Sequence, residues 1–180
     1  NRVKTNAGAR PGDVLILGKP LGVGVLSAAL KKGALDAAGY EVMIASTTQL
    51  NTPGKRLAHS EAVHALTDVT GFGLLGHLLE VCRGAKLSAF LDMGKIPLLA
   101  EVEKLATAGY ITGASARNWM AYGEDVALDA AITPMQRALL TDPQTSGGLL
   151  VACAAEAVDE VLEVFRAEGF AGAAVIGRLE

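Results

Sequence analysis

The stretch that most constrains the fold of this chain is Ala65–Leu78, which reads Ala-Leu-Thr-Asp-Val-Thr-Gly-Phe-Gly-Leu-Leu-Gly-His-Leu. A short apolar run ends in the carboxylate of Asp68, a hydroxyl and two glycines follow, and an apolar-periodic segment then begins. This order is typical of a strand, a tight turn and a helix N-terminus. We therefore expect Asp68 to be exposed at the end of a strand, where ligands commonly bind in α/β sheets.

Two structural interpretations of Asp68 stand beside the functional one. The carboxylate could cap the N-terminus of the following helix, or it could form an Asx-turn. At about 100° per residue, the apolar side chains of this helix share one broad arc: Leu74, Leu75, Leu78, Leu79, Val81 and Cys82. His77 falls on the opposite arc. A histidine there is more often a solvated polar residue than a ligand or a base, so we expect it at the surface.

The rest of the chain predicts an α+β fold, a mixed β-sheet covered by helices. Beside the strand that ends at Asp68, which we expect to be central, the apolar patterns predict strands at 14–17, 86–92, 149–153 and 173–179. They predict helices at 22–30, 35–50, 56–63, 97–108, 133–141 and 156–168, and leave 111–131 as the least regular part. Residues 1–10 are expected to be a lead-in or linker, and residues 11–180 a single domain.

Gly22 and Gly24 lie between a predicted strand and a predicted helix. Glycines at such a junction can cradle a phosphate. No Gly-Lys-Ser/Thr sequence follows them, so the segment is not a P-loop, and a tight connection is the alternative interpretation.

Composition narrows the class of protein. Hydrophobic residues make up 51% of the 180 residues, which excludes a disordered chain. A net charge of −3 offers no electrostatic reason to expect a nucleic-acid partner. No apolar run approaches the roughly 20 residues that a membrane span needs. Cys82 and Cys153 alone predict buried small side chains without a disulfide framework, as is usual in a reducing, cytoplasmic setting.

Four blocks of this sequence resemble the selenophosphate synthetase (selenide, water dikinase) family. Leu66–His77 and Asp142–Leu150 are long and specific matches, whereas Gly18–Leu26 and Arg117-Asn118 are weaker ones. The blocks occur in the family's order and span most of the chain. The resemblance implies the α+β layer structure of the C-terminal domain of the aminoimidazole ribonucleotide synthetase superfamily.

The resemblance also implies a reaction, in which ATP, selenide and water give selenophosphate, AMP and phosphate. Such phosphoryl transfer depends on positioning and on neutralising charge, commonly with magnesium. Asp68 matches the family's magnesium-binding aspartate, and Thr67, Thr70 and Gly71 are candidates for shaping the cofactor-binding loop. The resemblance carries no catalytic residue over to this sequence, and it assigns no chemistry to Arg117 and Asn118.

The family's reactive Cys or selenocysteine, its nearby Lys and most of its nucleotide-binding residues belong to an N-terminal domain that has no match in this sequence. We therefore expect this chain to be the C-terminal part of the enzyme and to be inactive alone. Its expected partners are its own N-terminal nucleotide-binding domain, which binds most of the ATP, together with selenide and, at full length, a second copy in a homodimer. Two alternatives remain: another ATP-dependent enzyme of the superfamily, of the aminoimidazole ribonucleotide synthetase or thiamine-monophosphate kinase type, or a non-catalytic domain-packing module.

Overall fold

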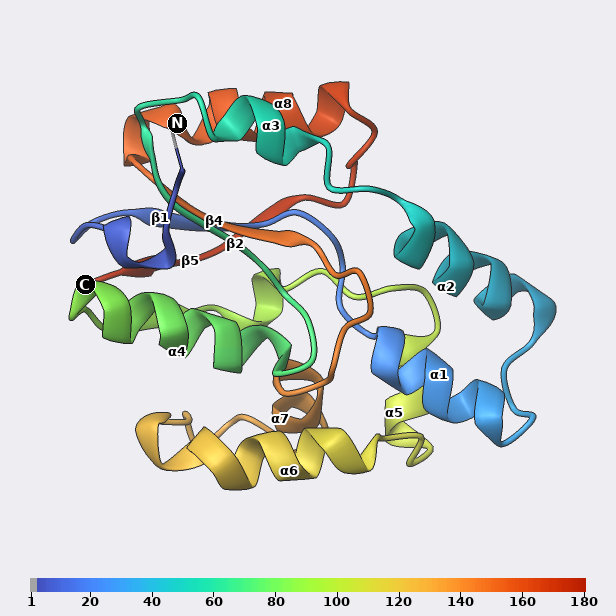
Figure 1. Ribbon diagram of the computed structural model, residues 1–180. Coiled ribbons are helices and arrows are strands. Elements are labelled where there is room, and N and C mark those ends of the chain that lie inside the picture. The colour runs from blue at the N-terminus through green and yellow to red at the C-terminus, as the bar shows by residue number, and fades with distance from the viewer. Residues whose placement is uncertain (1–2) are drawn as a thin grey trace.

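The computed structural model describes residues 3–180, which fold around one β-sheet with helices on both faces (Figure 1). The strands are β1 (Val14–Leu17), β2 (Val63–Asp68), β3 (Ala89–Leu91), β4 (Leu149–Cys153) and β5 (Ala174–Leu179). The helices are α1 (Val23–Lys31), α2 (Ala37–Thr48), α3 (Pro53–Leu57), α4 (Gly73–Ala85), α5 (Val102–Thr107), α6 (Gly113–Tyr122), α7 (Pro134–Leu140) and α8 (Val158–Ala167). Single 3₁₀ turns are formed at Asn6–Gly8, Met93–Lys95, Gly123–Asp125 and Ala155–Ala157.

The α+β class is confirmed, but the sheet is not mixed. Within residues 3–180 its order is β2-β4-β1-β5-β3, and every neighbouring pair of strands is antiparallel. In the described part of the chain, residues 3–180, a parallel contact occurs only as an isolated bridge between Leu21 and Leu98. β2 is therefore an edge strand and not the central one that we expected, because β4, from the far end of the sequence, pairs between β2 and β1.

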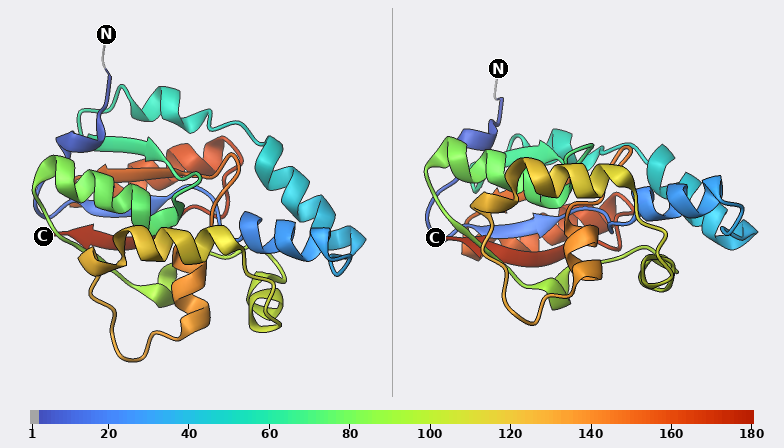
Figure 2. Two further views of the ribbon diagram at one scale, coloured as in Figure 1. Left: turned by 60° about the horizontal axis from the view of Figure 1, so that its bottom comes forward. Right: turned by 90° about the horizontal axis from the view of Figure 1, so that it is seen from below.

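Alternate side chains of the strands enter two hydrophobic layers, as the pleat requires. In β1, Leu15 and Leu17 face the layer under α4, α6 and α7, whereas Ile16 faces the layer under α3 and α8. Figure 1 shows α3 and α8 on one face of the sheet and α4 on the other. A third cluster fills the space between α1, α2, α5 and α7, beside the sheet. Figure 2 shows α1 and α2 extending away from the sheet at one end of the molecule.

Local signals placed several elements well. The helix predicted at 133–141 is α7, where Thr133 and Gln136 form a capping box and Pro134 occupies the first turn. The helix predicted at 156–168 is α8. The chain leaves this helix at Gly169, which adopts the left-handed conformation with φ of 85°. Both cysteines are buried and free, as expected.

Three element predictions are wrong. The helix expected at 56–63 is α3, which starts earlier because Pro53 suits a first helical turn, and Val63 already belongs to β2. The helix expected from residue 97 is shorter, because residues 97–99 run extended and exchange backbone hydrogen bonds with Leu21. The irregular stretch at 111–131 contains α6, whose first turn is capped by the Thr112 side chain.

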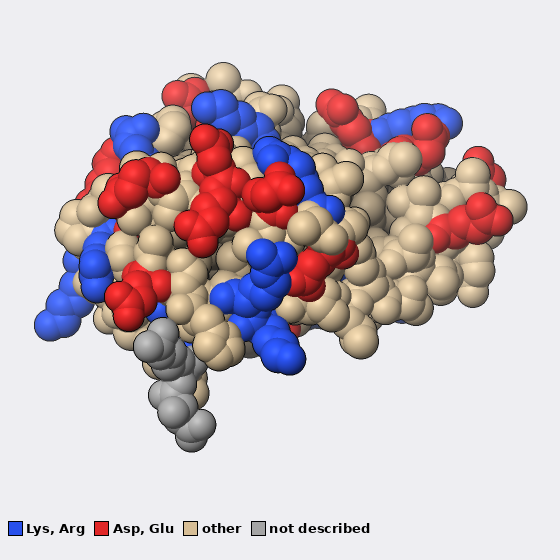
Figure 3. Space-filling model, turned by 90° about the horizontal axis from the view of Figure 1, so that it is seen from above, with Lys and Arg blue, Asp and Glu red and all other residues tan. Residues whose placement is uncertain are grey.

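The surface gives no sign of a single-charge patch over α3 and α8. Figure 3 shows acidic and basic side chains interspersed on the face that these helices cover. Among residues 3–180, no helix combines the length and the apolarity that crossing a bilayer would require.

Candidate functional site

Asp68 is the last residue of β2 and is exposed, as the sequence predicted. The residue at the N-cap position of α4 is Phe72, and no side chain caps that helix, so Asp68 does not serve as the N-cap. Within residues 3–180 its carboxylate makes no ion pair and no hydrogen bond. Asp68 therefore presents a free carboxylate to solvent at the edge of the sheet.

The turn after Asp68 is held by groups from three other segments, namely α4, α6 and the Asp142–Leu150 block. The Thr70 hydroxyl lies 3.1 Å from Nε2 of His77, and the Thr70 carbonyl accepts from the backbone amide of Gln144 at 3.0 Å. The Asn118 amide donates to the Gly71 carbonyl at 2.9 Å and also to the carbonyl of Thr141 at 3.0 Å. These contacts fix both the side chain of Thr70 and the backbone that follows Asp68.

Tyr122 adds a further contact to this turn. Its hydroxyl donates to the Phe72 carbonyl at 2.5 Å. Burial raises the pKa of Tyr122 to about 12, so the phenol keeps its proton and remains a donor at neutral pH. Tyr122, the last residue of α6, thus anchors the turn through this hydrogen bond.

The surface position expected for His77 is wrong, because its residue is only 7% exposed. The helical wheel assigned a single core face to α4, yet this helix is covered on two sides. The sheet packs against its leucines, while Tyr122 of α6 lies over the face that carries Gly76. Periodicity alone cannot reveal a second covered face, since that face depends on where α6 docks.

Glycines of the Asp142–Leu150 block let that block approach the turn closely. A Cβ on Gly147 would lie 2.0 Å from the Val69 carbonyl oxygen, and a Cβ on Gly148 would lie 2.2 Å from the Lys19 amide nitrogen. The Val69 amide also donates to the Gly148 carbonyl at 2.9 Å. Any side chain here would push the segment after Asp68 away from its support.

The same block occupies the N-terminus of α1. Asp142 Oδ2 accepts from the Gly24 amide at 2.9 Å and the Val25 amide at 3.4 Å. Gln144 Oε1 accepts from the amides of Gly22 and Val23, each at 3.2 Å. These amides are therefore already satisfied by side chains of the protein, which supports the tight connection and not a phosphate cradle.

Burial has a marked effect on Asp142, whose residue is 1% exposed. Loss of solvation raises the pKa of this carboxyl to about 7, although hydrogen bonds from Gln144, Val25 and Gly24 act in the opposite direction. Its Oδ1 atom is buried without a hydrogen-bond partner in residues 3–180.

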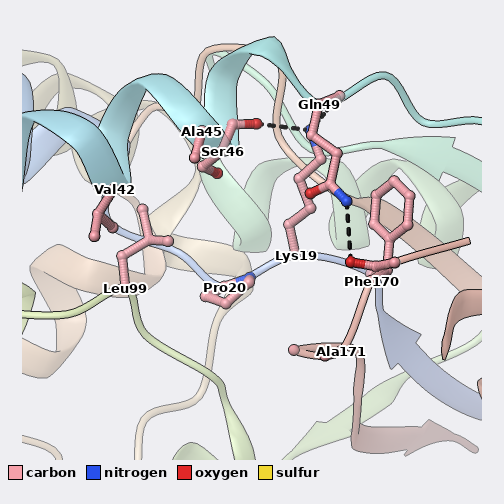
Figure 4. Close-up of a pocket in the computed structure, with 12 residues that line it drawn as sticks. Lys19, Pro20, Val42, Ala45, Ser46, Gln49, Leu99, Phe170 and Ala171 are labelled. Atoms are coloured by element: carbon pink, nitrogen blue, oxygen red, sulfur yellow. Dashed lines mark hydrogen bonds between the residues drawn. The ribbon is translucent and has the colours of Figure 1, made fainter.

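Lys19 joins the Gly18–Leu26 block to the same network. Its residue is 2% exposed, and its ammonium donates to three backbone carbonyls, of Ser46 at 3.0 Å, Gln49 at 2.7 Å and Ser146 at 2.6 Å. Burial lowers the pKa of Lys19 below its usual value. Lys19 and Gln49 line a cavity of about 460 Å³. Figure 4 shows these two side chains beside Phe170. Because its donors are used by backbone carbonyls, Lys19 holds α2 and the Asp142–Leu150 block together.

The structure brings the predicted candidates to one edge of the sheet but gives them different surroundings. Asp68 is free, and Thr70 is engaged by His77. Gly71 faces open space, since a Cβ there would meet nothing within 4 Å. The Thr67 hydroxyl lies 3.5 Å from the Asp68 carbonyl oxygen. Four further residues of the site were not predicted as site residues, although all of them lie in blocks that the sequence singled out: His77, Asn118, Asp142 and Gln144.

The side-chain donors near Asp68 suit a metal site shared with phosphate oxygens and water better than a site built from protein ligands alone. No group of three or more His, Cys, Asp or Glu side chains comes together within residues 3–180, so this part of the chain offers no complete protein cage. Mg²⁺ commonly uses one or two carboxylates together with phosphate oxygens and water. The exposed Asp68 carboxylate fits that kind of shared, partly open site.

Comparisons with known proteins place this geometry in context. The profile of the family described as "AIR synthase related protein, C-terminal domain" matches residues 10–180. Curated proteins named "Selenide, water dikinase" are similar to the chain: that of Burkholderia ambifaria (strain MC40-6) is 66% identical over 99% of this chain, and that of Rhizobium meliloti (strain 1021) is 52% identical over 98%. The matches cover 51% of each of these two proteins, so the chain spans about half the length of these relatives.

Solved structures with the same fold are more distant in sequence. The crystal structure of HypE from E. coli aligns with 98% of this chain at a TM-score of 0.66 and 20% identity, covering 46% of that protein. Thiamine-monophosphate kinase from Stenotrophomonas maltophilia K279a aligns with 99% of this chain at a TM-score of 0.66 and 20% identity, covering 51% of that protein. A structure of the hydrogenase maturation protein HypE in complex with ATP aligns with 98% of this chain at a TM-score of 0.64 and 19% identity, covering 44% of that protein.

Proposed function

This chain belongs to the family of C-terminal domains of AIR synthase related proteins, and we propose that it is the C-terminal half of a selenide, water dikinase. The full-length enzyme would convert ATP, selenide and water into selenophosphate, AMP and phosphate. The observation that carries this proposal is the high identity to proteins of that name over almost the whole chain. The solved neighbours, at 20% identity or less, support the fold and do not favour a thiamine or hydrogenase-related substrate.

Asp68 is the residue that we propose to hold the magnesium ion of this reaction. When bound, Mg²⁺ neutralises charge on the phosphates of ATP. Asp68 is suited to that role because its carboxylate is exposed, free of other partners in residues 3–180 and fixed at the end of a strand. Gly71, three residues further along the chain, has open space where a side chain would lie, which leaves room for phosphate groups.

The remaining groups of the site hold the turn after Asp68 in place. Asn118 and Tyr122 hold the backbone of the turn, and the Asp142–Leu150 block supports it from the other side. We assign no catalytic residue to this chain. ATP would be bound mainly by the N-terminal half, with Thr67, Thr70 and Gly71 shaping the loop that faces it. Following the resemblance, we further propose a cytoplasmic homodimer for the full-length protein.

A mutant separates the metal role of Asp68 from a structural one. Asp68→Asn keeps the shape of the side chain but removes the anionic oxygen that a hard cation requires. In the full-length enzyme we expect a large loss of selenide-dependent AMP formation, partly recovered at high magnesium, with a nearly unchanged melting temperature. Asp159→Asn, at an exposed position of α8, is the matched control and should keep full activity.

Two outcomes would contradict the proposal. Full activity of Asp68→Asn across a magnesium titration would exclude the metal role. Selenide-independent ATP turnover by the wild-type full-length enzyme, with no selenophosphate formed, would exclude the proposed reaction. The 180-residue chain alone is expected to form no AMP, since Asp68 is the one metal ligand that we assign to it and the other half of the enzyme would bind most of the ATP.

A further inference from the structure

A second cavity lies between α4 and β3, and no residue from 67 to 72 lines it. Its volume is about 540 Å³. Most of its wall is apolar, with side chains from α4, from β3 and from the segment before α7: Leu75, Leu78, Cys82, Leu91, Val126 and Leu128. A protein core leaves few voids larger than a water molecule, whereas ligand sites commonly enclose about 300–1,000 Å³. The volume of this cavity is therefore that of a ligand site and not of a packing defect.

The segment 126–132, called the strap here, forms one wall of the cavity. Figure 2 shows it as the yellow-to-orange loop that bows outward before α7. Its two ends are held, since Asp125 pairs with Arg83 of α4, and Thr133 and Gln136 form the capping box of α7. Between these ends no hydrogen bond joins the strap to α4 or β3 within residues 3–180. A ligand can therefore displace the strap without breaking any hydrogen bond to these two elements.

The charged groups of the wall are acidic. Asp125 and Asp129 belong to the lining, which contains no lysine, arginine or histidine among the described residues. Asp125 is paired with Arg83. Asp129 makes no ion pair within residues 3–180, and its Oδ1 atom accepts from the Ala131 amide at 2.8 Å. The uncompensated charge of Asp129 favours a positive group over a negative one at this wall.

We propose that this cavity binds a small organic cation with an apolar body, of the class of long-chain or aromatic amines. The apolar body packs against the side chains of α4 and β3, and burial of its surface supplies the affinity. The ammonium group lies beside Asp129, which supplies selectivity for a positive over a negative head group. This site is separate from Asp68, and its ligand is independent of the proposed reaction.

The test compares decylamine, decanol and decanoate, which share one chain and differ in the charge of the head group. Each is titrated below its micelle-forming concentration into the full-length protein and followed by calorimetry. Exposed ion pairs contribute a factor of about 2–5, so decylamine should bind more tightly than decanol by that factor, and decanoate should bind most weakly. Asp129→Asn should remove the preference for the amine. Glu124→Gln, an exposed position outside the lining, is the matched control and should keep it.

A second pair of variants locates the bound chain. Ala89 of β3 is partly buried and lines the cavity, so the ring of Ala89→Phe should fill the space and abolish decylamine binding. Ala130→Phe adds the same ring at an exposed position of the strap that does not line the cavity, and should leave binding unchanged.

The two cysteines give a readout in the wild type, which holds even if Ala89→Phe does not fold. Cys82 lines the cavity, whereas Cys153 is buried on the other face of the sheet under α3 and α8. Decylamine should slow the alkylation of Cys82 by N-ethylmaleimide and leave the rate at Cys153 unchanged, as measured by mass spectrometry of the separate peptides. Slowing at both cysteines would report a general gain in stability and would overturn the location of the site.

The other outcomes are equally decisive. Equal affinity for the three probes, or tighter binding of decanoate, would overturn the cationic class of ligand. Decylamine binding that persists in folded Ala89→Phe would overturn the cavity as the site. A full-length protein that binds none of the probes but forms selenophosphate would refute this inference and leave the proposed function in place. Binding of decylamine without selenophosphate formation would do the reverse.

Discussion

The stability of this domain should fall as the pH rises toward neutrality, because Asp142 is buried. Its pKa is raised from 3.8 to about 7, chiefly by lost solvation. A carboxyl with a raised pKa binds its proton more tightly in the folded state than in the unfolded state. Its contribution to stability is therefore fully present below the unfolded pKa of 3.8 and is lost as the pH rises through about 7.

The size of this effect follows from the shift. About three pKa units at 1.36 kcal/mol each correspond to roughly 4 kcal/mol across the full range. Roughly 2.5 kcal/mol of this stability should be lost between about pH 5 and about pH 8, because the carboxyl of the unfolded chain is already mostly ionised at the lower pH. That amount is a substantial part of the about 5–15 kcal/mol by which domains are stable.

Asp142→Asn isolates the contribution of this one group. The amide oxygen can still accept from Gly24 and Val25, while the amide nitrogen takes the place of Oδ1, which has no hydrogen-bond partner in residues 3–180. That unsatisfied donor costs about 1–3 kcal/mol at every pH, so it does not alter the slope. Urea unfolding of the wild type and the variant should therefore show a fall in stability with pH that is steeper in the wild type.

The comparison of the two slopes can refute the reasoning. Identical pH dependences would mean that Asp142 does not titrate with a raised pKa. A wild type that gains stability relative to Asp142→Asn as the pH rises would mean that the hydrogen bonds to Oδ2 outweigh the loss of solvation.

The remaining predictions concern stability and the support of the turn. Leu75→Ala and Leu78→Ala should each cost about 2–5 kcal/mol in the free energy of unfolding, measured by urea titration, because both side chains are buried under the sheet. His77→Ala should cost about 1–3 kcal/mol, since it leaves Thr70 without its partner in a buried site; a change as small as that of a surface residue would contradict the burial of His77. Gly147→Ala should lower both the melting temperature and the turnover of the full-length enzyme, because its Cβ would lie 2.0 Å from the Val69 carbonyl; wild-type values of both would show that the segment can shift freely.

The sequence by itself determined the features that local chemistry encodes. The apolar run at 14–17, the cap and proline of α7, the apolar spacing of α8 and the glycine at 169 each favour one backbone conformation over short distances. The exposed carboxylate at the end of β2 followed from the same kind of signal. The four blocks that resemble the selenophosphate synthetase family also identified the segments that meet around it.

Only the tertiary structure decided how those segments meet. Asn118 reaches Gly71 across 47 positions of sequence, and Asp142 reaches Gly24 across 118. The closeness of Tyr122 to Gly76 depends on the docking of α6, and the edge position of β2 depends on pairing with β4. Periodicity and capping residues reflect conformational preferences between residues that are close in sequence. A strand order or a second covered helix face arises when segments that are distant in sequence bury their apolar surfaces against one another.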